Sequence, residues 1–529
     1  MKHLLCGVAA IAVLAGCGQS SDAPGEEPLG DVELRQGDPA EAEAVITAMS
    51  LTNSGDGIIQ YGNKSVDGAK ATFSDVTIAG DMDGDVTAGT LEFDGLDMVD
   101  DKASFSKMSL QDITLADPDN ADNSVSIANI EILNPTPELA AWVAGSLGTG
   151  EPAPFPAPEQ LGFASWSVSD VSGNFTDDEG EGTLSLGKFE VRELADQKAR
   201  RAMLNDLAFD FMVSEDGEEV PVTMNLGSLS VSGIDMAFLE AVHENMGDEE
   251  AMAEALVSTM YKEPMDPGYD RIAMDSFSFD AAGASFEMPS LEATVERDSE
   301  GRPVKYVTKP FTMKLDADPE GGEAGAGLAQ GLSMVGYESV EMKGAGTADY
   351  DPDEDMLSMA AGDNYFEIVD GAKFSFGTRL GGYKAYSQQL SSALDFENMA
   401  EGEEPDPAVF QGALSELDLY NFELAIDDDG LVDRVLNAVA TQQGQDPEQM
   451  RNQVASMAQM APMMAQNSGV DMQLVSELST AISSFIKDPG TLTIKVNPEE
   501  PLSAETLAAM EDPSMLTKEY LGVSATPEN

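Results

Sequence analysis

The stretch Ala71-Thr72-Phe73-Ser74-Asp75-Val76-Thr77-Ile78 contains the pattern from which the fold can be predicted. Apolar side chains take turns with Ser, Thr or charged ones, which is typical of a half-buried antiparallel strand. The same rhythm returns in residues 103–110 and 124–132. These stretches predict strands that place their apolar residues on one face and their polar residues on the other.

Acidic, glycine-rich segments separate such strands. Residues 176–182 precede Thr183-Leu184-Ser185-Leu186, and residues 350–355 precede Met356-Leu357-Ser358-Met359. Asp, Gly and Pro favour tight turns, so both segments predict hairpin tips that carry much of the negative charge.

A second pattern is a strand that runs directly into a helix. It occurs where 126–132 leads into 138–143, where 229–236 leads into 237–242, and where 417–424 leads into 431–436. Asp427-Asp428-Asp429-Gly430 in the third case predicts a turn and a helix start. The uneven spacing excludes a solenoid of short repeats, and the recurrence suggests degenerate duplication of a strand-rich module.

The clearest helical pattern covers residues 430–486, with interruptions near 443–447 and 467–469. Val475, Leu478, Ile482 and Phe485 recur at helical spacing and predict a core-facing stripe. Pro489-Gly490 should end this helix, and 491–496 returns as a strand. The predicted fold class is α+β and β-rich: an extended, mainly antiparallel sheet with helices packed on it, most helical in the C-terminal third.

The N-terminus has the features of a secretory signal, with Lys2 followed by an apolar run from Leu4 to Leu14. Its end, Leu14-Ala15-Gly16-Cys17, resembles the lipobox of bacterial lipoproteins. This resemblance covers residues 1–18 and implies cleavage between Gly16 and Cys17, with lipid such as palmitate on Cys17. Gly18 lacks the aspartate of an inner-membrane retention signal, so the resemblance implies the outer membrane, with the body in the periplasm. An ordinary signal peptide is the alternative.

Four regions are therefore predicted along the chain. They are a lipoprotein signal peptide at 1–16, a lipidated, acidic and flexible tether at 17–42, a β-rich region with strand-to-helix units at 43–400, and a helix-rich region at 401–529 that ends in a strand and tail. The tether assignment depends on its Gly, Pro, Ser, Asp and Glu content, because such segments bury little apolar surface.

The large negative charge of the chain limits the kinds of molecule that it is expected to bind. The chain has 97 acidic and 27 basic residues, a formal charge of −70. Such a polyanion is repelled by nucleic acid and by anionic head groups, so only the N-terminal lipid is expected to attach it to a membrane. The acids are scattered along the chain, which favours solubility and non-specific contact with divalent cations over a dedicated cation site.

Cysteine and histidine are too scarce for many chemistries. Cys6 and His3 would leave with the signal, Cys17 would carry lipid, and His243 alone would remain. A disulfide, a cysteine nucleophile and a zinc site with several histidines are excluded. His243 is expected on a helix among acids, where an exposed position is commoner than a catalytic one. We predict no cofactor and no catalytic residue.

Two motifs imitate metal sites. Met457, Met460, Met463 and Met464 follow a three-residue rhythm like that of thioether clusters for Cu(I); a plastic core or a soft binding surface is the alternative, and no metal is assigned. Asp349-x-Asp351-x-Asp353-x-Asp355 imitates a calcium loop. Glu354 replaces its glycine and Ala360 its bidentate glutamate, so a hairpin tip is predicted instead.

Common catalytic motifs, such as Gly-x-Ser-x-Gly and His-Glu-x-x-His, were not found. The sequence thus favours a non-enzymatic outer-membrane lipoprotein with a structural or envelope-maintenance role, whose partner would be an envelope protein or an apolar ligand. The alternative is a carrier of lipid or another apolar ligand, since the strands resemble large periplasmic proteins of the AsmA type in texture. A carboxylate-based hydrolase would need a pocket where carboxylates converge with a displaced pKa. An open apolar groove would favour the carrier.

Overall fold

The computed structural model describes residues 29–54, 58–79, 86–116, 120, 123–147, 155–176, 180–215, 218–236, 265–393, 412–467, 470–503 and 517–528. The chain divides into two compact units. Unit 1 comprises residues 1–260 and 268–281, and unit 2 comprises residues 261–267 and 282–529. Each has an antiparallel sheet and helices, which confirms the predicted α+β, β-rich class. The change in sequence texture near residue 400 is therefore not the boundary of a compact unit.

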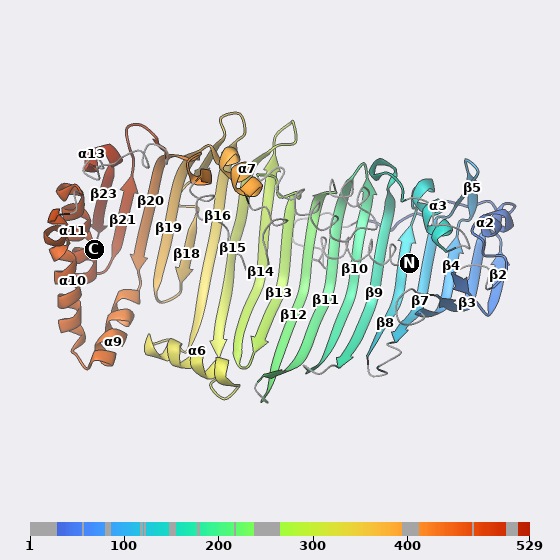
Figure 1. Ribbon diagram of the computed structural model, residues 1–529, viewed down its shortest axis with the longest axis horizontal. Coiled ribbons are helices and arrows are strands. Elements are labelled where there is room, and N and C mark those ends of the chain that lie inside the picture. The colour runs from blue at the N-terminus through green and yellow to red at the C-terminus, as the bar shows by residue number, and fades with distance from the viewer. Residues whose placement is uncertain are drawn as a thin grey trace. The chain divides into compact units, whose positions relative to one another are not determined.

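Unit 1 is an antiparallel meander, in which most strands pair with the next one along the chain, while β1 and β2 both pair with β3 (Figure 1). Its strands are β1 (Ile59–Gln60), β2 (Asn63–Asp67), β3 (Lys70–Ile78), β4 (Val86–Asp94), β7 (Lys107–Ala116), β8 (Ser124–Leu133), β9 (Phe163–Thr176), β10 (Gly180–Ala195), β11 (Lys198–Glu215), β12 (Glu218–Asp235) and β13 (Arg271–Ala281). β5 (Asp97–Val99) and β6 (Lys102–Ser104) form a separate pair. The predicted strands at 71–78 and 124–132 correspond to β3 and β8. The stretch 103–110 is split between β6 and β7, because Ser106 turns back to donate to the Asp94 carbonyl.

A row of kinks crosses the unit 1 sheet. One residue in every second strand has a positive φ, between 49° and 59°: Asp75, Asp112, Asp170, Asp206 and Ser276. At the same level the intervening strands carry only small residues, namely Gly89, Ala128, Gly187 and Gly227. A Cβ on Gly187 would lie 3.0 Å from Asp206 Oδ2, so glycine makes room for the kinked aspartate. Aspartate is among the residues that tolerate this conformation.

The kink row explains how each strand keeps its apolar residues on one face. In β3 the apolar residues recur every two residues, except at the kink, where Phe73 and Val76 are three residues apart. In a regular strand, side chains three residues apart point to opposite faces. Both are nevertheless buried in the same apolar cluster, at 0% and 1% exposure. The kink at Asp75 therefore returns the apolar side chains that follow it to the same face of the sheet as those before it.

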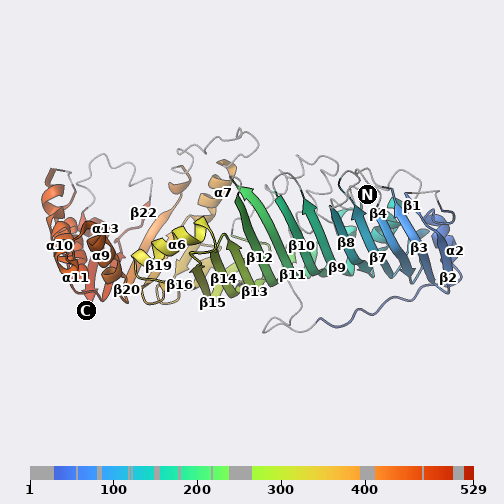
Figure 2. The same cartoon turned by 90° about the horizontal axis from the view of Figure 1, so that it is seen from below.

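Helices close the apolar face at the N-terminal end of unit 1. Helices α2 (Ala42–Ala48) and α3 (Pro137–Ser146) contribute Val45, Ile46 and Trp142 to the same cluster as the strands. In Figure 2, α2 lies beside β2 and β3. Phe73, Phe93 and Phe105 make edge-to-face contacts and are at most 1% exposed. We call this fully buried part of the core the closed end.

Part of the predicted tether is fixed to unit 1. The Arg35 guanidinium donates to the carbonyls of Phe105 and Pro135, at 3.2 and 2.6 Å. The Asn134 amide donates to the Glu33 carbonyl, and Arg192 donates to the Gly30 carbonyl at 2.7 Å. Hydrogen bonds from polar side chains to backbone carbonyls can fix such a segment without apolar side chains, so the packed region begins earlier than residue 43.

Unit 2 is a second antiparallel meander. Its strands are β14 (Ala284–Arg297), β15 (Pro303–Ala317), β16 (Ser339–Asp351), β17 (Met356–Met359), β18 (Tyr365–Ile368), β19 (Ala372–Gly381), β20 (Asp418–Asp428), β21 (Thr491–Val496), β22 (Leu502–Ser503) and β23 (Val523–Glu528). Both β17 and β18 bridge β16 and β19, while β20 pairs with β21 and β22. Its helices are α6 (Glu323–Met334), α7 (Tyr383–Ala393), α9 (Leu431–Gln443), α10 (Pro447–Met464), α11 (Met472–Lys487) and α13 (Lys518–Leu521).

The C-terminal helices begin where local chemistry predicts. Asp428 accepts hydrogen bonds from the N–H groups of Gly430 and Val432 ahead of α9, and Asp446 and Asp471 cap α10 and α11. The predicted stripe on α11 is only partly buried: Phe485 is 8% exposed, but Ile482 is 37% exposed. The prediction that the whole stripe faces the core was wrong, because the small residues Ser479, Ala481 and Ser483 take the other buried positions of α11, and Ala481 packs in one cluster with Phe485 and Leu492 of β21.

Candidate functional site

A patch of large apolar side chains lies on the apolar face of unit 1, on strands β9 to β13. Two cross-strand rows form it. One row joins Leu184, Phe209, Met224 and Phe279, and the next joins Phe175, Gly182, Phe211 and Val222. Val213 follows Phe211 on the same face of β11. We call these side chains, without the glycine, the open patch.

The open patch belongs to the same sheet face as the closed end but is much more accessible. Phe175, Val213 and Phe279 are 39%, 42% and 38% exposed. Apart from one 3₁₀ turn at 158–160, α2 and α3 are the only helices among the described residues of unit 1, and both pack at the closed end. A contiguous exposed apolar surface of this kind usually marks a ligand or partner site.

Glycines let the aromatic rings lie flat on the sheet. A Cβ on Gly182 would overlap the Phe211 ring, and one on Gly173 would come within 3.0 Å of the Phe175 ring. The rings of Phe209 and Phe211 stack, with centroids 5.9 Å apart and an interplanar angle of 17°. The result is a shallow floor of rings, with the backbone beneath it covered.

The opposite, polar face of unit 1 carries its own charge row. Arg192, Arg201 and Arg271 occupy one cross-strand row with Ser232 between the last two. Glu190, only 7% exposed, accepts a hydrogen bond from Ser165 at 2.8 Å and lies 3.5 Å from the Arg192 guanidinium. Glu190 thus supplies counter-charge to Arg192 at one end of this row.

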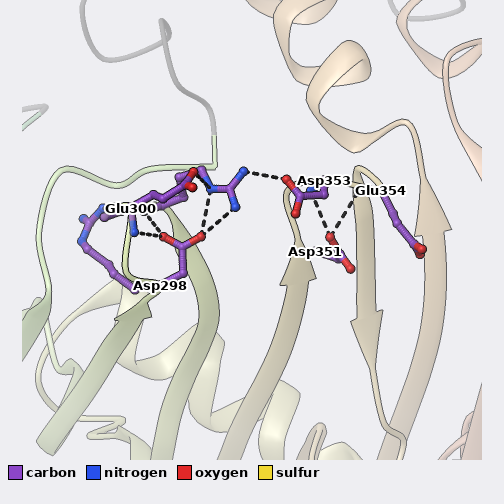
Figure 3. A network of polar contacts seen from close by, with 8 residues as sticks. Asp298, Glu300, Asp351, Asp353 and Glu354 are labelled. Carbon is purple, nitrogen blue, oxygen red and sulfur yellow. Dashed lines mark hydrogen bonds and ion pairs between the residues drawn. The ribbon is translucent and has the colours of Figure 1, made fainter.

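The acidic motif at 349–355 forms the tip between β16 and β17, as predicted (Figure 3). Asp351 accepts hydrogen bonds from the N–H groups of Asp353 and Glu354, while Asp355 accepts from the Tyr350 hydroxyl. Asp353 pairs instead with Arg302 at 2.8 Å. The carboxylates thus serve different partners. In the described parts of the chain, no group of three or more His, Cys, Asp or Glu side chains could hold a metal ion.

Arg302 joins this tip to the β14–β15 turn through its ion pairs with Asp353 and Asp298, both of which are labelled in Figure 3. Its guanidinium donates to Asp298 at 2.9 Å, and Asp298 also accepts from the Arg302 and Glu300 N–H groups. The backbone N–H of Arg302 is the main cause that lowers the pKa of Asp298, and the guanidinium adds to it. These contacts hold two turns of unit 2 together and leave the Asp298 carboxylate fully engaged.

A groove of about 680 Å³ lies between α11, α13 and β23. It is lined by Met472, Gln473, Ser476, Glu477, Thr480, Ala481, Ser484, Lys518, Ala525 and Pro527. Glu477 pairs with Lys518 and accepts the N–H of Ala525, and the Lys518 hydrogen bond lowers its pKa. A hydrolase would need at least two converging carboxylates, one of them an acid with a raised pKa. This groove offers a single, ionised carboxylate.

The predicted methionines lie together on the C-terminal half of α10. Met457, Met460, Met463 and Met464 are 55%, 48%, 71% and 76% exposed. The core interpretation was therefore wrong for these residues, because the contacts that bury Met450 on the same helix, at 3% exposure, do not extend to its last turns.

Gly16, Cys17 and His243 lie outside the described residues, so the predictions of cleavage, lipidation and an exposed histidine stay predictions. The sequence analysis missed the open patch. Its signal was present in the alternation of Phe209, Phe211 and Val213, but that alternation resembles that of any covered strand. Among the described residues, no helix is both long enough and apolar enough to span a bilayer.

A family model described as "uncharacterized protein" matches residues 365–528, which lie within unit 2. No curated protein and no solved structure matches the chain significantly.

Proposed function

We propose that the protein is a lipid-anchored protein of the bacterial outer membrane that binds the apolar part of a lipid on the open patch, without catalysing a reaction. The exposed aromatic rows of β9 to β13 are the observation that carries this proposal. They favour the carrier over a purely structural role, because a structural sheet gains stability by covering such side chains.

An acyl chain suits the chemistry of the patch. Burying apolar surface contributes about 25 cal/mol per Å², so covering even part of each exposed Phe would contribute on the order of 1 kcal/mol per ring. The rows of rings run across neighbouring strands, which suits a long and flexible apolar ligand. The formal charge of −70 opposes anionic head groups, so a neutral or zwitterionic lipid fits best.

The proposed anchor would keep the patch near its ligand. A lipid on Cys17 holds the protein at a bilayer, which raises the local lipid concentration. Replacing Cys17 by Ser should abolish palmitate labelling and release the protein from the membrane. Continued labelling of this variant would contradict the anchor but would leave the patch untouched.

Displacement of a zwitterionic probe, a phosphatidylcholine with a fluorescent acyl chain, by unlabelled phosphatidylcholine tests the patch. We expect Phe175→Ser combined with Phe279→Ser, whose rings are 39% and 38% exposed, to weaken probe binding by at least tenfold. Phe376→Ser is the matched control, because Phe376 in unit 2 has a comparable exposure of 37%. Circular dichroism must show that each variant is folded. Equal probe binding by the parent, the patch variant and the control would refute the proposal.

A further inference from the structure

We propose that the C-terminal half of α10 binds one Cu(I) ion through the thioethers of Met457, Met460 and Met464, three of its four exposed methionines. The first observation is their exposure, between 48% and 76%, on a helix that buries other apolar residues. Ala455 and Met450 of the same helix are 0% and 3% exposed. Because these side chains are largely exposed, packing in the core does not explain why Met recurs along this part of the helix.

The second observation is the composition of this part of the helix. Residues 455–466 contain only Ala, Ser, Met, Gln and Pro. A surface that docks an apolar partner is served as well by Leu, Ile or Phe, whereas every large apolar residue here contains sulfur. Thioethers are soft ligands and select Cu(I), while hard cations require the oxygen ligands that this stretch lacks in carboxylate form.

The helix brings the sulfur atoms within reach of one ion. With 3.6 residues per turn, Met457, Met460 and Met464 lie within about 60° of one another around the axis and span about 10 Å along it. Each sulfur sits at the end of a flexible side chain, so three can converge. The face that carries them is not the one held by Arg451, whose guanidinium donates to the Ile486 carbonyl of α11 at 2.6 Å.

The charge of the chain favours a cation at this surface. A formal charge of −70 raises the local concentration of cations. The helix itself has no acidic residue between 455 and 466 that would favour Ca²⁺ or Mg²⁺. Long-range charge thus attracts the ion, and the thioethers select it.

The test is an anaerobic Cu(I) titration of the full chain with a competing chromophoric chelator. Cys6→Ser and Cys17→Ser in the parent remove both thiols, so that thioethers are the only soft sulfur ligands. We expect one equivalent of Cu(I), and sulfur ligation in X-ray absorption. Replacing Met457, Met460 and Met464 together by Leu should weaken Cu(I) binding by at least tenfold.

Leucine preserves helix propensity, size and apolar character, so this variant removes the sulfur and keeps the surface. Met334→Leu, at a 59% exposed methionine on α6, is the matched control and should bind like the parent. Unchanged Cu(I) binding by the triple Leu variant, or no stoichiometric binding by the parent, would overturn the proposal. The proposal would also be overturned if the parent bound no copper and an apolar partner bound the parent and the Leu variant equally well.

Discussion

The closed end and the open patch of unit 1 are built from the same kind of strand. Both lie on the apolar face of one meander, and both are crossed by the same kink row, at Asp75 in the first and Asp206 in the second. Phe93 at the closed end is 0% exposed, while Phe279 in the open patch is 38% exposed. Cover by α2 and α3, and not strand sequence, sets this difference.

The contrast separates two roles of one pattern. Where helices lie on the sheet, aromatic side chains build a core. Where no described helix lies on it, the same alternation leaves a surface that can accept an apolar ligand. The described helices of unit 1 pack at its first strands, so the buried core and the exposed apolar surface lie at different parts of the sheet.

The largest expected effect comes from removing a ring at each site. Phe93→Ala should lower the free energy of unfolding by about 3–5 kcal/mol, because it leaves a cavity in a closed core. Phe279→Ala should cost roughly 1–2 kcal/mol, because its ring is already partly hydrated. Urea unfolding followed by tryptophan fluorescence reports on unit 1, since Trp142 and Trp166 both lie there. Equal losses of unfolding free energy for Phe93→Ala and Phe279→Ala would contradict the difference between the closed end and the open patch.

Substitutions in the kink row should have the same effect on stability at the closed end and beside the open patch. Asp75→Val and Asp206→Val should each destabilise unit 1 by about 1–3 kcal/mol, because β-branched residues resist positive φ. Asp206→Gly is the control and should be nearly neutral, since glycine adopts this conformation freely. The same urea titration measures all three. A large loss for the glycine variant would show that the carboxylate, and not the backbone conformation, matters.

The smallest expected effect is a difference in acid sensitivity between two helices: α11, which is held partly by ionised side chains, and α2, which is held by apolar ones. In unit 2, the pKa of Asp471 is lowered chiefly by the Lys518 N–H, and that of Glu477 by the Lys518 side chain. The stabilisation is therefore complete above the unfolded pKa values, near 4, and is lost as the pH falls through the lower folded values. Hydrogen exchange of α11 amides should quicken in that acidic window.

Glu477→Gln should weaken this acid dependence, while Met472→Leu in the same groove should leave it unchanged. The α2 residues Val45 and Ile46 are apolar, so exchange of their amides should change less over the same window. Acid sensitivity of the α2 amides equal to that of α11 would contradict a difference between the two covers.

Much of the fold could be predicted because it depends on neighbours in the chain. The strand at 71–78, the tip at 350–355, the helix start after Asp428 and the interruption near 443–447 all follow from local alternation, turn chemistry and capping. The candidate sites could not be predicted in the same way. Phe209 and Phe73 follow similar patterns, and only their surroundings differ.

The sequence by itself determined a β-rich α+β chain with acidic turns, a chemistry short of thiols and imidazoles, and the positions of several strands and of helices α3, α9, α10 and α11. Tertiary structure decided which apolar residues are buried in the core, which lie on the surface and which are placed as candidate metal ligands. It turned the three-residue step from Phe73 to Val76 into a kink and left the methionines of α10 exposed. The reason is physical: alternation and capping act over a few residues, whereas burial depends on which distant segments lie on a given face.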